Sequence, residues 1–194
     1  ARRFDFTGFL MIALALAAFQ LLLESNGDHF TLWHTGKPAL YLNEITEGTL
    51  TLPDGLTYVG QWVGGQINGT GRLTQPNGDG YEGGFVDGQK QGQGRLTYAI
   101  GHVYEGGFNA DQRSGKGIFT GTDGAIFDGD WVAGRLQGTG RITFPDGSVY
   151  EGEVADDQPA GTGKITYADG ATYEGAWVAG AINGEGTATY VGGA

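Results

Sequence analysis

A pattern of one aromatic residue and several glycines recurs at a fixed distance through most of this chain. Each aromatic residue follows the previous one by 23 residues, and the series is Tyr58, Tyr81, Tyr104, Phe127, Tyr150 and Tyr173. A glycine stands two residues after each of them, and a Gly-x-Gly triplet follows, as in Gly161 and Gly163. Because a segment this short cannot bury a core alone, the period predicts a repeat array in which neighbouring repeats pack against each other.

The joins between repeats are typical of β-hairpin turns. In one join, Pro145 and Asp146 suit the first positions of a three-residue loop, and Gly147 can adopt the left-handed conformation that closes it. Glycine stands at the closing position of all six joins. Each join is therefore predicted to be a hairpin.

A three-residue loop also fixes which residues face each other across the hairpin. Ile142 is predicted to face Tyr150, and Gly140 to face Gly152. Since side chains alternate between the two faces of a strand, one face carries the rings and the glycines. The glycines leave a trough without side chains, and we expect the ring of the adjacent repeat to fill it.

Aromatic residues along this trough are the candidate site for a partner. Large rings carry much of the binding energy in protein interfaces, which favours those that line the trough. The alternative is that the tyrosines, which recur at the structural period, serve only the packing of the array. The predicted partner-binding residues are Trp62, Phe85, Phe108, Trp131, Trp177, Tyr81, Tyr104, Tyr150 and Tyr173.

The opposite face is expected to be polar and solvated. It carries a row of threonines, such as Thr143 and Thr166, beside charged residues of both signs. Arg141 and Glu151 are predicted neighbours across one hairpin, and such a pair stabilises strand pairing by about 0.2–1 kcal/mol.

These landmarks together resemble MORN repeats. The resemblance rests on the motif Tyr-Glu-Gly followed by an aromatic residue, on Gly-x-Gly and on the Asp-Gly turn, and it covers residues 46–194. It implies an all-β repeat fold, an elongated single antiparallel sheet of consecutive 23-residue β-hairpins. Phe127 in place of tyrosine and Val154 in place of an aromatic residue depart from the pattern. The family is also linked to phospholipid binding, which the charge of this chain argues against.

The N-terminal stretch predicts a single transmembrane helix. Residues 6–23 carry no formal charge, and residues 4–23 as a helix would span about 30 Å at 1.5 Å per residue. Arg2 and Arg3 precede this stretch and Glu24 follows it, so the positive-inside rule places the N-terminus in the cytoplasm. The repeats would then be periplasmic, or lumenal in a eukaryote. A cleaved signal peptide is the alternative.

Three segments follow from these patterns. Residues 1–24 are the predicted anchor, residues 25–45 a connector without clear periodicity, and residues 46–194 the array. The array begins on half a repeat, and its last strand offers an open edge. Open edges pair readily with other strands, so we expect contact with another chain there, including a second copy in a homo-oligomer.

Charge and composition restrict the function. From Thr46 onward there are 8 Lys and Arg residues against 18 Asp and Glu residues, which argues against nucleic acid and anionic lipid as partners. The chain has no cysteine and no phosphate-binding or nucleophile motif, and we expect no metal site, no cofactor and no catalysis.

The sequence thus predicts a non-catalytic, membrane-anchored MORN-repeat scaffold that mediates protein–protein interaction or self-association. One alternative is an accessory subunit whose helix packs into an integral-membrane complex. Another is a module that binds lipid or cell-wall glycan.

Overall fold

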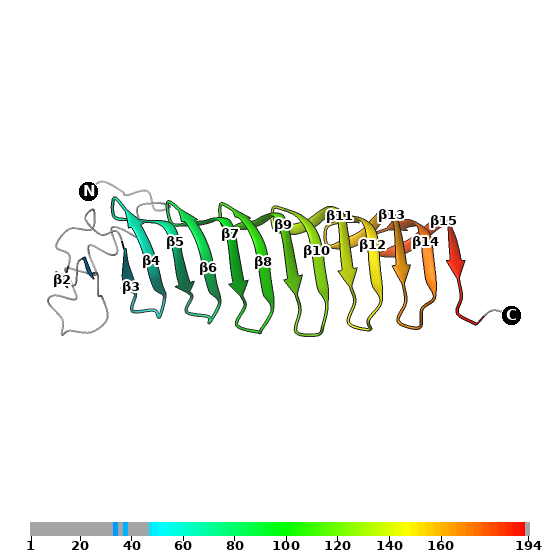
Figure 1. Cartoon of the computed structure of the whole chain (residues 1–194), viewed down its shortest axis with the longest axis horizontal. Helices are drawn as coiled ribbons and strands as arrows, with labels where there is room; N and C mark the ends of the chain where they lie inside the picture. The colour runs from blue at the N-terminus through cyan, green and yellow to red at the C-terminus, as the bar shows by residue number, and fades with distance from the viewer. Residues whose placement is uncertain (1–32, 35–36, 39–46, 193–194) are drawn as a thin grey trace, which may run out of the picture. The chain divides into compact units, whose positions relative to one another are not determined.

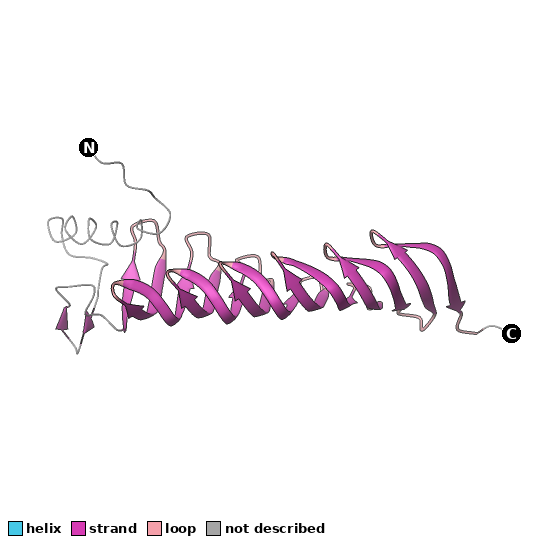
Figure 2. Ribbon diagram, turned by 90° about the horizontal axis from the view of Figure 1, so that it is seen from above, coloured by secondary structure: helices cyan, strands magenta, loops and turns pink. Residues whose placement is uncertain are grey.

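A computed structural model describes residues 33–34, 37–38 and 47–192. All secondary structure in these described parts is β-strand (Figure 2). No helix that could cross a membrane occurs among them. The predicted transmembrane segment at residues 4–23 lies outside the described residues. The alternative, a cleaved signal peptide, concerns the same stretch and is therefore not described either.

The connector contains one structured element that the sequence did not predict. Strand β1 (Trp33–His34) pairs antiparallel with β2 (Lys37–Pro38). The rest of residues 25–45 lies outside the described part.

The chain divides into two compact units, residues 1–99 and residues 100–194. Within each unit, every strand of the repeat array pairs antiparallel with the next strand in the sequence (Figure 1). The array strands of the first unit are β3 (Glu47–Thr51), β4 (Thr57–Val63), β5 (Gln66–Thr74), β6 (Gly80–Val86) and β7 (Gln89–Thr97). Those of the second unit are β8 (Val103–Asn109), β9 (Gln112–Thr120), β10 (Ile126–Val132), β11 (Arg135–Thr143), β12 (Val149–Ala155), β13 (Gln158–Thr166), β14 (Thr172–Val178) and β15 (Ala181–Thr189).

The predicted three-residue loops are confirmed. Phe144 N donates to Ser148 O at 2.8 Å, and Gly147 N donates to Phe144 O at 2.9 Å. All six closing glycines have φ between +87° and +97°. The register is the predicted one, because Ile142 lies opposite Tyr150 and Gly140 opposite Gly152.

A second kind of turn joins the two strands inside each repeat. Val132 pairs with Arg135, and the two residues between them, Ala133 and Gly134, have φ of 48° and 83°. Two consecutive residues with positive φ make the type I′ turn, whose twist matches that of paired strands. Alanine occupies the first position in three of these turns, at residues 110, 133 and 179.

Alanine in this conformation is strained, which gives a testable prediction. Ala133→Gly is expected to raise the free energy of unfolding by about 0.5–1 kcal/mol, because relief of the left-handed strain exceeds the added entropy of the unfolded chain. Chemical denaturation of the full chain measures the change. The exposed Val132→Ala variant, one residue earlier, is the control, and a loss of stability in Ala133→Gly would contradict the prediction.

A bulge lies between the two kinds of turn. In the first unit Gly60 lies opposite Gly71, whereas Trp62 lies opposite Ile67, so β5 carries two more residues than β4 over this stretch. One of them is Gly69, which has φ of +90°. The first glycine of each Gly-x-Gly triplet is therefore required by the backbone of the bulge.

Candidate functional site

The tyrosine that marks each repeat lies over glycines of its own hairpin. A Cβ atom built on Gly163 would lie 2.2 Å from Tyr150 Oη, and one on Gly152 would lie 2.7 Å from the same oxygen. Tyr150 Oη donates to Glu153 O at 2.6 Å. We call this arrangement, a ring covering two opposed glycines, the ring seat.

The sequence analysis expected a ring of the adjacent repeat in the glycine trough, and this expectation is wrong. The ring that fills the trough belongs to the same hairpin as the glycines. The hairpin itself brings Gly163 opposite Gly152, and it places a carbonyl three residues beyond the tyrosine within reach of the hydroxyl. The same bond to a carbonyl three residues on is made by Tyr58, Tyr81, Tyr104 and Tyr173.

Rings of the adjacent repeat contact each seated tyrosine from the edge. Tyr58 lies 5.6 Å from Trp62 of its own repeat and 5.2 Å from Phe85 of the next, with interplanar angles of 80° and 86°. Tyr104 makes the same two contacts with Phe108 and Trp131. Edge-to-face pairs of this kind contribute about 0.5–1.5 kcal/mol beyond the burial of their area.

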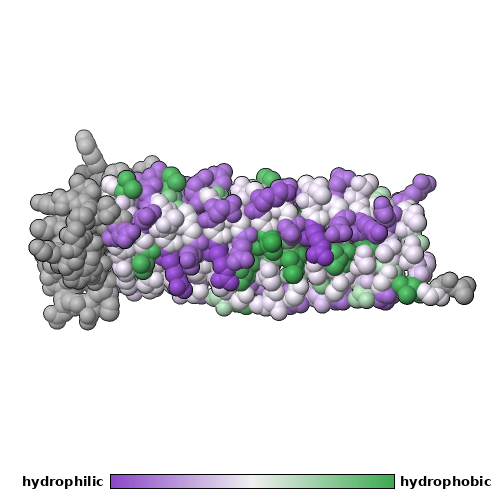
Figure 3. All heavy atoms as spheres, in the orientation of Figure 1, coloured by the Kyte–Doolittle hydropathy of each residue, from purple (hydrophilic) through white to green (hydrophobic). Residues whose placement is uncertain are grey.

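All nine predicted partner-binding residues lie in the interior. Their exposed fractions run from 0% for Tyr104 and Tyr150 to 8% for Tyr173. The structure brings them together as the core of each unit, so little of their surface is open to another molecule. A role in partner binding stays a prediction, while their packing role is visible in the contacts. The face in Figure 3 shows mainly residues of intermediate hydropathy, with hydrophilic and hydrophobic ones among them.

The indole nitrogens differ between the repeats. Trp131 Nε1 donates to Gly117 O at 2.8 Å, and Trp177 Nε1 donates to Gly163 O at 3.1 Å. Trp62 Nε1 is buried and meets no acceptor within the described part of the chain.

Phe127 breaks the ring seat. Without a hydroxyl it cannot donate to a carbonyl, and its ring instead lies 6.0 Å from the ring of Phe119. A Cβ atom on Gly140 would meet Leu136 Cδ2 at 3.1 Å, so the fully buried Leu136 occupies the place of the tyrosine.

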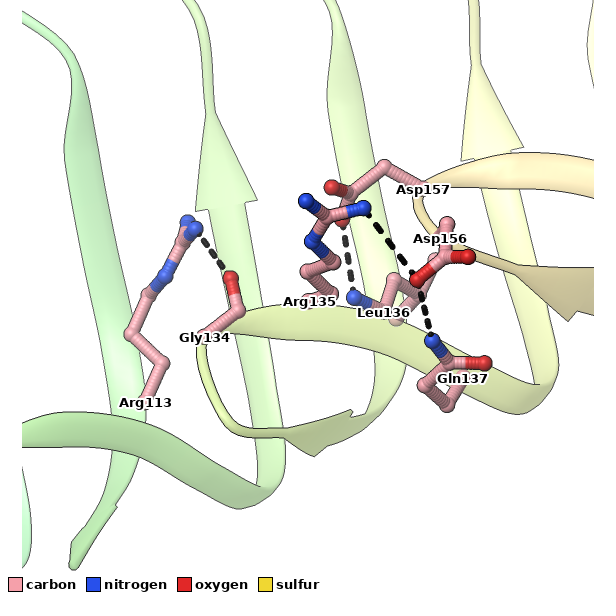
Figure 4. Close-up of polar contacts among 7 residues, drawn as sticks. All are labelled: Arg113, Gly134, Arg135, Leu136, Gln137, Asp156 and Asp157. Carbon is pink, nitrogen blue, oxygen red and sulfur yellow. Dashed lines mark hydrogen bonds and ion pairs between the residues drawn. The ribbon is translucent and has the colours of Figure 1, made fainter.

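One cation is packed against the aromatic core of the second unit. The Arg113 guanidinium lies 4.2 Å from the centre of the Trp131 ring and donates a hydrogen bond to Gly134 O (Figure 4). Its position in the period is occupied by Ile67, Leu136 and Pro159 in other repeats, all buried. Lys90 occupies the same position in the first unit, 5.7 Å from the centre of the Tyr81 ring. Sequence reasoning missed both residues, although two basic residues in a column that is otherwise apolar were a detectable signal.

Within each unit, two-residue turns bond to the preceding repeat. Asp157 Oδ1 accepts from Leu136 N at 2.8 Å, and Asp156 Oδ1 accepts from Gln137 Nε2 at 2.8 Å (Figure 4). Asp156 also forms an exposed ion pair with Arg135 at 3.3 Å. A carboxylate at the turn therefore provides contacts that glycine at the same position cannot provide.

The polar face of the second unit carries a row of alternating charge. Consecutive cross-strand partners on this face form what we call the charge ladder: Asp128, Arg141, Glu151, Lys164 and Glu174. The predicted neighbours Arg141 and Glu151 form an exposed ion pair at 3.3 Å. Such a pair contributes about 0–1 kcal/mol, so the ladder adds little to the stability of the unit.

Grooves run beside the glycines on the polar face of both units. The groove of the second unit has a volume of about 710 Å³, and Glu151, Lys164 and Glu174 stand along it. The groove of the first unit has a volume of about 950 Å³, with Arg72 and Glu82 in its lining. Within residues 47–192, no group of three or more His, Asp or Glu side chains is placed to hold a metal ion.

Burial changes the acidity of Tyr58, the first of the seated tyrosines. Loss of solvent raises the pKa of Tyr58 to about 12, against the opposing effect of its hydrogen bond to the Gln61 carbonyl. A pKa that is higher in the folded state stabilises the fold below the unfolded value, near 10, and this stabilisation is lost as the pH rises through the folded value.

We therefore expect the first unit to lose stability between about pH 10 and pH 12 because Tyr58 ionises more readily in the unfolded chain. Denaturant unfolding of the full chain at a series of pH values measures this dependence. Tyr58→Phe, which cannot ionise, should show a shallower decline over the same interval. Equal declines in both proteins would assign the effect to other groups.

The ring seat, the three-residue loop and the type I′ turn define a tandem β-hairpin repeat protein. The family profile of the MORN repeat matches six consecutive repeats, at residues 58–80, 81–103, 104–126, 127–149, 150–172 and 173–194. The chain belongs to the MORN repeat family. A comparison with curated proteins gave no match.

Two solved structures of other proteins are similar to this chain. The TCP domain of SAS-4 (dCPAP) from Drosophila melanogaster, in complex with a proline-rich motif of Ana2 (dSTIL), is 17% identical with a TM-score of 0.39, and the match covers 82% of this chain and 99% of that one. The TCP10 domain of Danio rerio CPAP is 14% identical with a TM-score of 0.28, and the match covers 67% of this chain and 66% of that one. Likeness at this level says nothing about what this chain binds.

Proposed function

We propose that this MORN-repeat chain is a non-catalytic scaffold that binds other proteins. The observation that carries the proposal is the difference between the interior of each unit and its polar face. The rings are buried in the interior of each unit, whereas charged and hydroxyl groups recur along the polar face. A periodic polar surface on a rigid sheet suits recognition of another protein, and the grooves on it are open rather than enclosed.

In this proposal the nine predicted aromatic residues support partner binding without contacting the partner. Their packing holds the polar face in shape, and the partner contacts the charges and threonines outside them. Substitution of a buried ring would then weaken partner binding only as far as it unfolds the unit.

We include the membrane anchor in the proposal. Its support is the uncharged stretch at residues 6–23, flanked by Arg2 and Arg3 on one side and Glu24 on the other. The scaffold would have its N-terminus in the cytoplasm and its repeats in the periplasm, or in a lumen in a eukaryote. The same stretch supports the second candidate, an accessory subunit of an integral-membrane complex.

Self-association belongs to the proposal as well. Strand β15 pairs with β14, and all nine of its residues are exposed. A strand edge of this kind can pair with the same strand of another copy.

Isolation of the full chain from membranes in a mild detergent tests the scaffold function. We expect a protein partner to be retained in fixed stoichiometry, and to be lost when residues 47–192 are deleted. A partner lost instead on deletion of residues 1–24 would favour the accessory-subunit candidate. Retention of no protein, together with binding of purified glycan or anionic vesicles at moderate salt, would overturn the proposal.

A further inference from the structure

We propose that the groove of the second unit binds a basic segment of a partner protein in the polyproline II conformation, with Lys or Arg at every third residue. This inference rests on the proposed scaffold function and names the chemistry of the partner.

The groove has a backbone floor and polar walls. Gly152, Gly163 and Gly175 form its floor, so a partner segment meets no side chain there. The charge ladder provides one wall. Thr162 lies on the other side, where its hydroxyl donates to Glu153 Oε1 at 2.7 Å and its amide donates to the same oxygen at 3.1 Å.

The charge of the unit selects a basic partner. Residues 100–194 contain 5 Lys and Arg residues against 13 Asp and Glu residues. Such a field attracts a basic segment and speeds its association. A second copy of this chain, laid face to face, would bring the same acidic excess against itself. The charge therefore favours a foreign basic segment over self-pairing on this face.

Thr162, which lines the groove, holds the Glu153 carboxylate in place beside it. Donation from the Thr162 hydroxyl and the Thr162 amide lowers the pKa of Glu153. Glu153 is thus an additional fixed negative charge beside Glu151 and Glu174 at neutral pH.

The spacing of the ladder selects the conformation of the segment. Glu151 on β12 and Glu174 on β14 are two strands apart, which corresponds to about 9.5 Å at 4.7–4.9 Å per strand. Three residues of polyproline II advance about 9.3 Å along the axis. Side chains on one face of a β-strand recur at about 6.7 Å, and a seven-residue helical repeat advances about 10.5 Å. The three-residue period is the one that matches.

The residues between the carboxylates complete the fit. A polyproline II segment makes no internal hydrogen bonds, so its carbonyl groups remain available as acceptors. Lys164 lies between Glu151 and Glu174 in the ladder, and Thr187 follows Glu174. The Lys164 ammonium and the Thr187 hydroxyl are donors that can reach such carbonyls along the same wall.

The groove of the first unit is a natural internal control. It has the larger volume, and its lining carries two carboxylates and one guanidinium group, from Glu47, Glu82 and Arg72. Glu82 lies between Arg72 and Arg95 in the ladder, and residues 47–99 contain only 3 Lys and Arg residues against 5 Asp and Glu residues. A basic segment is expected to bind this groove more weakly than the groove of the second unit, where the acidic excess is larger.

The test uses the full chain in mild detergent with three fluorescent peptides of equal length and equal lysine count. One has lysine at every third residue between prolines, the second has lysine at every second residue in a threonine-rich strand sequence, and the third has all its lysines clustered. Anisotropy titrations at low and moderate salt measure the affinities. We expect the first peptide to bind most tightly and its binding to weaken with salt.

The variant Glu151→Gln/Glu174→Gln removes two exposed charges at nearly constant shape, and we expect it to weaken binding of the first peptide by about tenfold. Glu82→Gln in the first unit is the matched control, with an expected change below about twofold. Circular dichroism and the denaturation midpoint verify that both variants fold.

Three outcomes would overturn the inference: equal affinity for all three peptides, unchanged binding by the double variant, or a loss of self-association in that variant without any peptide binding. Failure of the scaffold function itself looks different. If the full chain retains a protein partner from membranes while no peptide binds, the scaffold stands and only the basic segment is refuted.

Discussion

Replacement of Trp131 by alanine is expected to lower the free energy of unfolding of the second unit by about 3–5 kcal/mol. The ring is 2% exposed and lies 5.1 Å from the ring of Tyr104 in a T-shaped contact. Its Nε1 donates to Gly117 O, and its face holds the Arg113 guanidinium at 4.2 Å. Alanine would leave a cavity, remove the hydrogen bond to Gly117 O and take away the nearest of the three rings that Arg113 contacts.

Chemical denaturation followed by circular dichroism measures this loss in the full chain. Trp131→Phe keeps much of the volume and the edge contact but not the hydrogen bond, so it should cost clearly less. Val132→Ala is the neighbouring control, because Val132 is 59% exposed and should change stability by less than about 0.5 kcal/mol. Similar stabilities for Trp131→Ala and Val132→Ala would refute the role of the ring in the core.

The second large effect is expected for Gly163→Ala. The added methyl group would lie 2.2 Å from Tyr150 Oη and 2.4 Å from Cζ, closer than any real contact allows. The ring is fully buried and held by its hydroxyl at the Glu153 carbonyl, so it cannot turn aside without losing that bond. We expect a loss of about 3 kcal/mol, at the upper end of overpacking effects.

The matched control for this substitution is Gly138→Ala. A Cβ atom added to Gly138 would meet no atom of the described residues within 4 Å, and only the φ of +75° resists a side chain, which costs about 1 kcal/mol. A double-mutant cycle with Tyr150→Ala isolates the steric contact. Removing the ring should make Gly163→Ala nearly harmless, and purely additive effects of the two changes would speak against the ring seat.

The hairpin register could be predicted from the sequence because it depends on local chemistry. A proline, an aspartate and a glycine at Pro145–Gly147 specify a loop of one length, and the loop length sets every pairing beyond it. The alternation of faces then follows from strand geometry alone. No knowledge of distant contacts was needed for this part of the fold.

The occupant of the glycine trough could not be predicted in the same way. Two glycines show that something approaches the backbone, but they do not say which ring it is. The choice of Tyr150 over a ring of the next repeat is made by its hydroxyl, which reaches the carbonyl of Glu153 in its own strand. The bulge that places this carbonyl carries no separate sequence signal beyond the first glycine of Gly-x-Gly.

The nine aromatic residues were predicted as a candidate site from their residue type, but the sequence did not show how deeply they are buried. Rings such as Trp62 and Phe85 suit an interface as well as a core, and only the closeness of adjacent hairpins decides that they are covered. Periodic spacing predicts which residues share a face of the sheet. It does not predict how much of that face is buried by neighbouring repeats. The groove beside the charge ladder is lined by strands of two consecutive repeats, so no single segment of the sequence predicts it.

The ring seat has a consequence for how such an array grows. Because a tyrosine, its two glycines and its carbonyl acceptor all lie within one 23-residue segment, duplication of that segment in a gene brings a complete packing element with it. The new repeat meets neighbours that already fit its edges. Lengthening or shortening by whole repeats then preserves the packing, whereas an insertion between a tyrosine and its Gly-x-Gly triplet would separate the ring from its glycines.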